Sequence, residues 1–335
     1  MIGSGLEIEN IMYPYVVADI GGTNARFALV TGAKGGPYTL SQKRTYKSGG
    51  FESFDILIAT YLDSLEDVRP GAACIAVAGP VQKDIIRVTN LDWEISASRT
   101  RRNLNLKSFH LINDFAALAY ALPRLAPEDY EHIYQGKTTS ERATMAVIGA
   151  GTGFGVAGLS PVSHGWEIIS SEGGHISFAA TTEWEWQLAQ RLRGPDGHVS
   201  VEQLLSGPGL LSLYQYIVKL NGRSSHCDNP ADVSSAALAN SDIDCVEAVE
   251  FFCKILARVA GDVALTMGAQ GGLYIGGFIA TQLEPFLHKN DFKQMFLSKG
   301  PMSHYVEQIP VRLIKSPDAA LFGAAAWIDD HSLEE

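Results

Sequence analysis

The sequence has little cysteine, and the cysteines that it has are scattered. Four cysteines occur among 335 residues, and none of them forms a Cys-x-x-Cys motif with another. This scarcity argues against a disulfide framework and against a structural zinc site. It favours a reducing compartment, so we expect a cytoplasmic protein.

Positive charge and long apolar runs are also scarce. The 26 Lys and Arg residues against 37 Asp and Glu residues give a formal net charge of −11. This charge argues against nucleic acid and acidic membrane surfaces as partners, because both attract basic proteins. No apolar run reaches the ~18 residues of a membrane-spanning helix, and residues 1–11 lack the pattern of a signal peptide. We therefore expect a soluble protein.

The apolar content is ample for a core, since hydrophobic residues make up 46% of the chain. A chain of 335 residues is long enough for two domains of ~100–200 residues each. Residues 15–30 and 143–159 both read as strand, glycine-rich turn and strand, and a shift of 130 residues superposes Gly21 on Gly151. This shared organisation predicts two related halves.

The first glycine-rich turn, residues 19–24, joins two predicted strands. Consecutive glycines let the backbone approach a ligand closely, and the N–H groups of such a turn form an anion-binding nest. Arg26 would add positive charge if its side chain pointed inward, and a divalent cation would explain a carboxylate beside a phosphate. An ordinary β-hairpin is the alternative. The candidate nucleotide-binding residues of this turn are Asp19, Gly21, Gly22, Thr23 and Asn24.

The second glycine-rich turn, residues 149–155, has four glycines at alternate positions. Glycine weakens a strand, so this pattern is easier to understand where the backbone must approach a phosphate. The turn lacks the Gly-Lys-Ser/Thr of a Walker loop, and a strand rather than a helix follows it, unlike a dinucleotide-binding fingerprint. Its candidate phosphate-binding residues are Gly151, Thr152 and Gly153. Two such turns facing each other would hold the phosphates of a nucleoside triphosphate.

Asn113 and Asp114 directly follow a short apolar run and precede a helical pattern. A carboxylate at the carboxyl end of a strand faces the crevice where open α/β sheets hold ligands. An unperturbed aspartate has a pKa of about 3.9, so we expect Asp114 to be ionised at neutral pH. It could then accept a proton from an alcohol whose oxygen attacks phosphorus. A helix cap is the alternative role for this pair.

Further polar candidates are Glu172 and His175, in the sequence Glu-Gly-Gly-His, and Glu202. Carboxylates and amides suit a polyol, because each exchanges hydrogen bonds with ring hydroxyls. Each of these residues alone could equally be a capping or surface residue. A metal site at the Glu-x-x-His pair is disfavoured, because the two glycines between Glu172 and His175 argue against a helix.

With these motifs, the chain resembles a known family, the bacterial-type glucokinases of the hexokinase/actin-like ATPase superfamily. The resemblance covers about residues 14–328 and rests on five motifs in a fixed order. These are Asp19-Ile-Gly-Gly-Thr-Asn-Ala-Arg26, Leu111-Ile-Asn-Asp-Phe115, Gly149-Ala-Gly-Thr-Gly-Phe-Gly155, Glu172-Gly-Gly-His175 and Leu205-Ser-Gly-Pro-Gly-Leu210.

The resemblance implies a ribonuclease-H-like (actin-like ATPase) α/β fold, with two α/β domains that have mixed sheets and close an interdomain cleft over the sugar. The small domain would hold residues 1–120 and 316–335, and the large domain residues 121–315. The small-domain sheet should be mixed because hairpins join its first three strands.

The resemblance also implies an ATP-dependent glucokinase of glycolysis, which makes glucose 6-phosphate from D-glucose. Asp114 would be the base toward the 6-hydroxyl and, with Asn113, Glu172, His175 and Glu202, would bind the sugar. The two glycine-rich turns would meet the phosphates, and Gly276 and Gly277 would lie at the adenosine. Mg²⁺ would arrive with ATP near Asp19, with no direct protein ligand, and the protein would form a homodimer.

Some departures and alternatives bear on these expectations. Ser171 stands where a relative has Gly before Glu-Gly-Gly-His. The zinc-binding cysteine cluster of the related repressor/open-reading-frame/kinase family is absent, and no helix-turn-helix precedes the first predicted strand. A kinase for another hexose, ADP or polyphosphate as the donor, and a non-catalytic sugar-binding regulator are the alternatives.

Overall fold

The computed structural model describes residues 14–31, 38–79, 84–88, 91–137 and 142–331. These residues form two compact units. Unit 1 contains the described residues of Met1–Leu125, His164–Trp166 and Pro317–Glu335, and unit 2 contains those of Ala126–Ser163 and Glu167–Ser316. Each unit is an α/β structure with its own mixed sheet.

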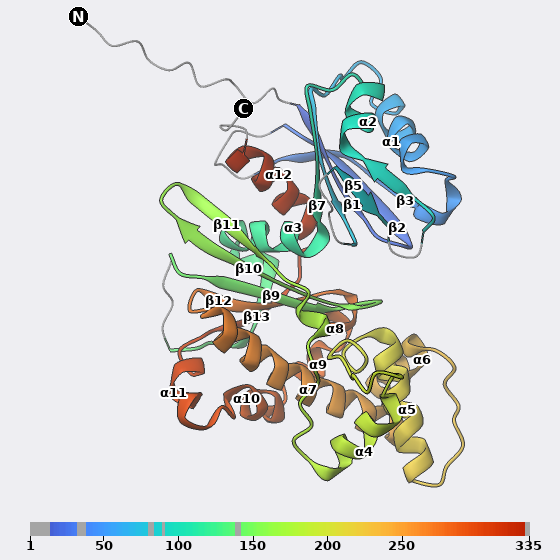
Figure 1. The fold of residues 1–335 in the computed structure, drawn as a ribbon, viewed down its shortest axis with the longest axis vertical. Helices are drawn as coiled ribbons and strands as arrows, with labels where there is room; N and C mark the ends of the chain where they lie inside the picture. The colour runs from blue at the N-terminus through green and yellow to red at the C-terminus, as the bar shows by residue number, and fades with distance from the viewer. Residues whose placement is uncertain (1–13, 32–37, 80–83, 89–90, 138–141, 332–335) are drawn as a thin grey trace, which may run out of the picture. The chain divides into compact units, whose positions relative to one another are not determined.

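Unit 1 is built on a five-stranded sheet with the order β3-β2-β1-β4-β7 (Figure 1). The first three strands pair antiparallel, whereas β4 pairs parallel with β1 and with β7. The expectation of a mixed sheet is therefore confirmed. The strands are β1 (Tyr15–Ile20), β2 (Asn24–Val30), β3 (Leu40–Lys47), β4 (Ala72–Val77) and β7 (Ser108–Asn113), and a separate ribbon contains β5 (Ile85–Arg87) and β6 (Glu94–Ser96).

Helices cover both faces of this sheet, and the central strand β1 shows why. Val16 and Ala18 lie in a core that includes Leu57 of α1, while Val17 lies in a second core that includes Leu321 of α12. Side chains alternate between the faces of a strand, so a strand with apolar residues on both faces needs cover on both sides. The helices of unit 1 are α1 (Phe54–Asp63), α2 (Ala97–Asn103), α3 (Asp114–Ala121) and α12 (Ala319–His331).

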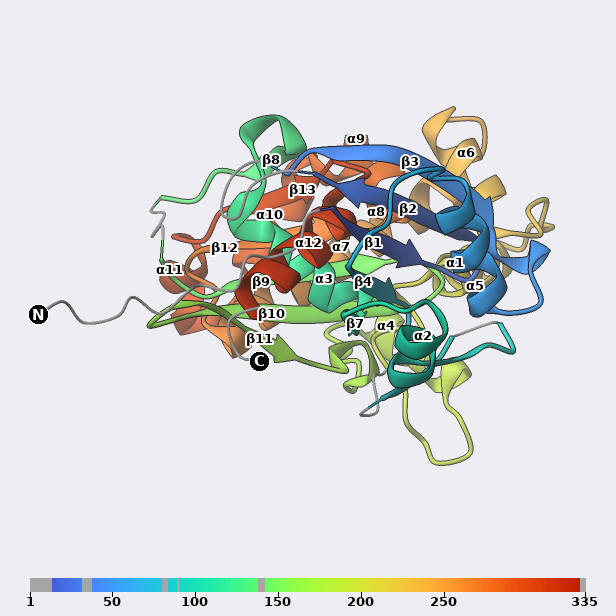
Figure 2. The same cartoon turned by 90° about the horizontal axis from the view of Figure 1, so that it is seen from above.

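Helices α3 and α12 lie side by side in both ribbon views (Figures 1 and 2). Their backbones approach so closely that a Cβ atom at Gly323 would lie 1.6 Å from the carbonyl oxygen of Ala117. Arg124 also binds the end of α12, with Nη2 2.9 Å from Oδ1 of Asp330. This packing holds α3, whose first residue is Asp114, against the sheet.

Unit 2 is built on a six-stranded mixed sheet with the order β11-β10-β9-β12-β13-β8. The strands of this sheet are β8 (Tyr130–Tyr134), β9 (Met145–Ala150), β10 (Phe154–Val162), β11 (Gly165–Ser170), β12 (Gly272–Gly276) and β13 (Val311–Ile314), and the first two residues of β11 are grouped with unit 1. The helices of unit 2 are α4 (Glu183–Leu192), α5 (Gly207–Leu220), α6 (Pro230–Leu238), α7 (Ile243–Met267), α8 (Phe278–Gln282), α9 (Glu284–Leu287), α10 (Asn290–Leu297) and α11 (Ser303–Val306).

The longest helix of unit 2, α7, is bounded by local sequence signals. The side chain of Asp242 accepts hydrogen bonds from the N–H groups of Asp244 and Cys245 at its start, and Gly268 ends it in the left-handed conformation with φ 61°. Phe252 and Leu256 on its apolar stripe are fully buried against the sheet core. The helix therefore holds the strands that carry the second glycine-rich turn.

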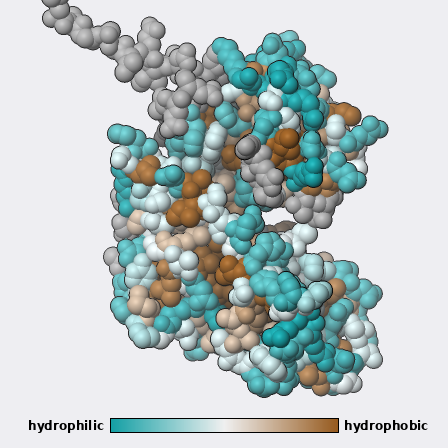
Figure 3. Space-filling model, viewed as in Figure 1, coloured by the Kyte–Doolittle hydropathy of each residue, from teal (hydrophilic) through white to brown (hydrophobic). Residues whose placement is uncertain are grey.

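On the face drawn in Figure 3, hydrophobic side chains form small separate patches, and the surface of unit 2 over α4–α6 is mainly hydrophilic. Across the described part of the chain, no helix has the length and apolar character needed to span a membrane.

Candidate functional site

The first glycine-rich turn lies between β1 and β2 and is held by hydrogen bonds from within and from outside. The N–H of Gly21 donates to the carbonyl oxygen of Asn24 at 2.9 Å. Ser48 is buried, and its hydroxyl donates to the carbonyl oxygen of Gly21 at 2.8 Å. Its N–H donates to the carbonyl oxygen of Thr23 at 3.0 Å. Ser48 has no recognisable sequence signal, because its role depends on the pairing of β2 with β3.

Asp19 forms an ion pair with Arg26, which lies directly opposite it on β2. Nη2 of Arg26 is 2.6 Å from Oδ2 of Asp19, and Nη1 donates to the carbonyl oxygen of Pro317 at 2.6 Å. Burial raises the pKa of the Asp19 carboxyl, and the charge and hydrogen bond of Arg26 partly offset this rise. The guanidinium of Arg26 therefore lies against Asp19, the first residue of the turn, and its contribution to phosphate binding stays a prediction.

Asn113 is the last residue of β7 and the N-cap of α3. Its Oδ1 accepts hydrogen bonds from the N–H groups of Phe115 at 2.9 Å and Ala116 at 3.2 Å. Its Nδ2 donates to the carbonyl oxygen of Gly79 at 3.1 Å. The helix-cap alternative is thus correct for Asn113, but the amide has a second N–H that could still bind a ligand.

Asp114 is the first residue of α3 and has a strongly perturbed carboxyl group. Loss of solvation raises its pKa to about 7, and the negative charge of Asp19 contributes to the rise. Hydrogen bonds from the backbone, such as the 3.0 Å bond from the N–H of Phe115 to Oδ1, act in the opposite direction. The expectation of an ordinary, fully ionised aspartate is therefore wrong, because burial and the nearby charge are tertiary effects.

In unit 2, Glu202 holds the second glycine-rich turn. Its Oε2 accepts a hydrogen bond from the N–H of Phe154 at 2.7 Å, and a Cβ atom at Gly153 would lie 2.4 Å from this oxygen. The turn is also closed internally, since the N–H of Gly151 donates to the carbonyl oxygen of Gly153 at 2.8 Å. At Gly151, by contrast, an added Cβ atom would meet nothing within 4 Å. The structure therefore brings a predicted sugar ligand and a predicted phosphate turn into contact.

The Glu-Gly-Gly-His turn lies against the same glycine-rich turn. The N–H of Glu202 donates to the carbonyl oxygen of Gly174 at 2.9 Å, and a Cβ atom at Gly174 would lie 2.0 Å from the carbonyl oxygen of Phe154. Glu172 and His175 are both exposed, so their side chains are free to meet a ligand. Ser171 supports this turn, because its hydroxyl accepts a hydrogen bond from the N–H of Gly173 at 2.8 Å.

Gly276 and Gly277, at the end of β12, also adjoin the second glycine-rich turn. Gly276 pairs with Gly149 in the parallel register of β12 and β9. Gly277 has φ 91°, and a Cβ atom there would lie 2.5 Å from the carbonyl oxygen of Ala150. Glycine is required at Gly277 both by this conformation and by the close approach. Unit 2 thus gathers all its predicted site residues at one edge of its sheet.

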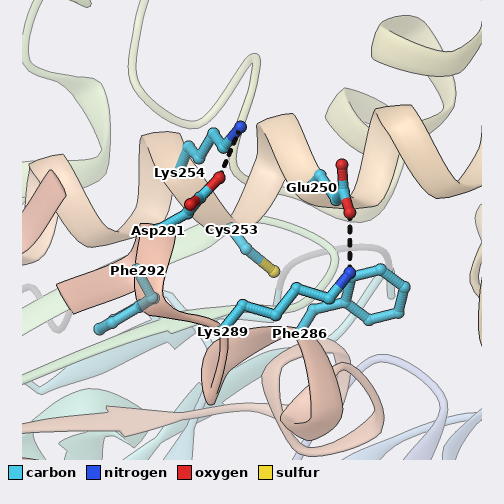
Figure 4. Close-up of a pocket in the computed structure, with 7 residues that line it drawn as sticks. All are labelled: Glu250, Cys253, Lys254, Phe286, Lys289, Asp291 and Phe292. Carbon is cyan, nitrogen blue, oxygen red and sulfur yellow. Dashed lines mark hydrogen bonds and ion pairs between the residues drawn. The ribbon is translucent and has the colours of Figure 1, made fainter. Parts of the chain in front are cut away.

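A small pocket between α7 and α10 lies apart from these residues (Figure 4). Two ion pairs cross it, Lys254–Asp291 at 2.9 Å and Lys289–Glu250 at 2.7 Å. Its cavity volume is about 10 Å³, which is room for about one water molecule. Among the residues that the structure describes, no group of three or more His, Cys, Asp and Glu side chains is arranged to hold a metal ion.

The chain is similar to glucokinases in sequence. The model of the Glucokinase family matches residues 16–331. The glucokinase of Saccharophagus degradans is 41% identical over 318 residues, which cover 95% of this chain and 99% of the relative. The glucokinase of Chromobacterium violaceum is 40% identical over 319 residues, which cover 95% of this chain and 90% of the relative.

Solved structures show the same fold. The glucokinase from an Antarctic psychrotroph has a TM-score of 0.84 and 38% sequence identity, with 94% of this chain and 98% of that chain covered. The glucokinase from Balamuthia mandrillaris in complex with glucose has a TM-score of 0.77 at 20% identity, over 94% of this chain and 93% of that chain, a likeness of fold alone. The predicted actin-like ATPase fold is confirmed, and the chain belongs to the glucokinase family.

Proposed function

We propose that this protein transfers the γ-phosphoryl group of ATP to the 6-hydroxyl of D-glucose, which yields glucose 6-phosphate and ADP, and that Asp114 is the general base. The oxygen of the 6-hydroxyl attacks the γ-phosphorus, the bond from this phosphorus to the bridging oxygen of ADP breaks, and Asp114 accepts the hydroxyl proton. This proposal rests mainly on Asp114, which directly follows the parallel strand β7 and whose carboxyl pKa is raised to about 7. A base with a pKa near the working pH is well matched to proton transfer.

The roles of the other site residues belong to the same proposal. Asn113, Glu172, His175 and Glu202 bind the sugar hydroxyls. The residues of the two glycine-rich turns, Asp19 and Gly21 to Asn24 in unit 1 and Gly151 to Gly153 in unit 2, bind the phosphates. Gly276 and Gly277 lie at the adenosine. The contact of Glu202 with Phe154 supports this assignment, because it couples a sugar ligand to a phosphate turn within one unit.

Mg²⁺ is part of the proposal, as a companion of ATP near Asp19. Mg²⁺ in proteins usually keeps several water molecules and takes one or two carboxylates together with substrate phosphates. Asp19 fits this pattern, since Arg26 is hydrogen-bonded to Oδ2 and Oδ1 has no partner among the described residues. Asp19 would hold such an ion through a water molecule, and the ion would reduce the negative charge of the phosphates.

The test measures ADP release with glucose, Mg²⁺ and ATP for the wild-type protein and for Asp114→Asn. The variant keeps the shape of the side chain but cannot accept a proton, so we expect kcat to fall by at least ~10². Asp129→Asn, at an aspartate of unit 2 outside the proposed site, is the control. If Asp114→Asn retained most of the wild-type turnover, Asp114 would not be the base.

The same assay separates the alternatives. A panel of mannose, fructose and N-acyl hexosamines tests the sugar, because carboxylates and amides alone do not determine the stereochemistry at C2. ADP and polyphosphate in place of ATP test the donor. Glucose binding without phosphoryl transfer in any combination would instead support a non-catalytic regulator.

Three further expectations complete the proposal. The protein works in the cytoplasm, forms a homodimer, and has a small domain of residues 1–120 and 316–335 and a large domain of residues 121–315. Sedimentation of the purified protein tests the homodimer. Limited proteolysis, followed by mass determination of the fragments, tests the two domain boundaries.

A further inference from the structure

Phe278 is the most exposed large hydrophobic side chain among the described residues, with 71% of its surface exposed. It is the first residue of α8 and directly follows Gly277. Single exposed hydrophobic residues are common on protein surfaces and need no explanation by themselves. The position of Phe278 beside the second glycine-rich turn is what distinguishes it from the others.

Phe278 is held next to this turn by the backbone. The register of β12 with β9 pairs Gly276 with Gly149, and Gly277 packs against the backbone of Ala150. Helix α8 accordingly lies beside the carboxyl end of β9 (Figure 1). These contacts leave no room for a side chain at Gly277. They fix the backbone where the chain leaves β12, and Phe278 follows there as the first residue of α8.

We propose that the ring of Phe278 is the stacking surface for the purine base of the nucleotide. This inference rests on the proposed function, which places phosphates at Gly151–Gly153, and it adds the residue that contacts the base. An aromatic ring offers a flat apolar face to a base, and such stacking tolerates any base because every base has a π-face. With 71% of its surface exposed, the side chain of Phe278 is open to such a contact.

The experiment compares Phe278→Ala, Phe278→Trp and Ile243→Ala with the wild-type protein. Ile243 is the matched control, because it is also in unit 2, is 69% exposed and lies at the start of α7. Two probes separate base from phosphate contacts. ADP has a base and phosphates, whereas inorganic tripolyphosphate has phosphates and no base. The Kd of each is measured by calorimetry.

We expect Phe278→Ala to raise the Kd of ADP about tenfold, by loss of the stacking contact. The Kd of tripolyphosphate should stay unchanged, Phe278→Trp should bind ADP at least as tightly as wild type, and Ile243→Ala should behave as wild type. In turnover, the KM for ATP should rise about tenfold, with kcat and the KM for glucose unchanged. The melting temperature should not move, because the side chain is outside the core.

Three results would overturn the proposal. Unchanged ADP affinity in Phe278→Ala with normal turnover would remove Phe278 from the nucleotide site and leave the proposed function intact. An equal loss of affinity for ADP and tripolyphosphate would show a general disturbance of the turn. A change of oligomeric state in sedimentation, without a change in ADP affinity, would assign the ring to a subunit contact. Conversely, ADP binding that depends on Phe278 in a protein that phosphorylates no hexose would contradict only the proposed function.

Discussion

Asp19 and Arg26 lie opposite each other on β1 and β2, and their side chains form an ion pair of 2.6 Å. The same guanidinium also binds the carbonyl oxygen of Pro317, in the segment that leads into α12. One side chain thus joins the first glycine-rich turn to the helix that packs against α3. Since Asp19 in turn raises the pKa of Asp114, the charge state of this cluster couples the proposed phosphate site to the proposed base.

The raised pKa of Asp114 predicts the acid limb of the pH–rate profile. Below pH about 7 Asp114 is mostly protonated and cannot accept the hydroxyl proton, so kcat/KM for glucose should fall with a midpoint near this value. Asp19→Asn removes a negative charge that raises the pKa of Asp114, so the midpoint should shift to lower pH. A wild-type midpoint near pH 4 would show an unperturbed carboxyl and contradict the assignment.

The same pKa predicts how the stability of Asp114→Asn depends on pH. Because folding raises the pKa of this carboxyl from its ordinary value of 3.8 to about 7, the native state binds more protons than the unfolded state between these pH values, and wild-type stability declines as the pH rises across this window. Asparagine cannot ionise, so the variant should be more stable than wild type above pH 7, on the order of 1–3 kcal/mol. Urea denaturation at pH 5 and pH 8 measures this difference, which should be much smaller at pH 5.

The ion pair of Asp19 predicts the effect of Arg26→Met. The variant leaves a largely buried carboxylate without its partner, so we expect a loss of about 1–3 kcal/mol in the free energy of unfolding at pH 8. The loss should shrink in acid, because a protonated Asp19 needs no counter-ion. Arg26→Lys keeps the charge and should recover part of the stability.

A double-mutant cycle with Asp19→Asn gives the control for this prediction. If the ion pair is responsible, Arg26→Met should cost much less in the Asp19→Asn background. Equal costs in both backgrounds would assign the effect of Arg26 to its hydrogen bond with Pro317 instead.

Two glycines of the second turn form a matched pair for testing where the phosphates lie. At Gly151 an added Cβ atom would meet nothing within 4 Å of the protein, so Gly151→Ala should leave the melting temperature unchanged. If a phosphate approaches this backbone, the new methyl group should raise the KM for ATP by about tenfold or more. A wild-type KM for ATP in Gly151→Ala would show that no phosphate of ATP approaches this residue.

At Gly153 the same substitution acts through Glu202. The new Cβ atom would lie 2.4 Å from Oε2 of Glu202, so the carboxylate must leave the N–H of Phe154. We expect Gly153→Ala to lose about 1–3 kcal/mol of stability and to raise the KM for both ATP and glucose. A rise in the KM for ATP alone would show that Glu202 does not bind the sugar.

Much of the fold could be predicted from local sequence, because its signals act over a few residues. Asp242 is a capping residue followed by an apolar stripe, a local pattern that predicts a helix reaching about Met267, and α7 spans Ile243–Met267. Helix α5 is harder to predict from local sequence, since residues 206–209 resemble a loop that would place its start at Leu210, whereas the structure begins it at Gly207. Ser206 caps that start through a hydrogen bond to the N–H of Gly209, so the helix includes a proline and two glycines that resemble a loop in sequence.

By itself, the sequence determined the order of strands and turns, the residue types at each turn and the family of the chain, because these depend on neighbouring residues and on motifs in a fixed order. Only the tertiary structure decided what surrounds those residues. It placed Ser48 under the first turn, Glu202 against the second, and Asp19 near Asp114. The physical reason is that burial, charge coupling and close backbone approach arise between segments far apart in the chain. For that reason, the pKa of about 7 at Asp114 could not be read from Asp114 or its sequence neighbours.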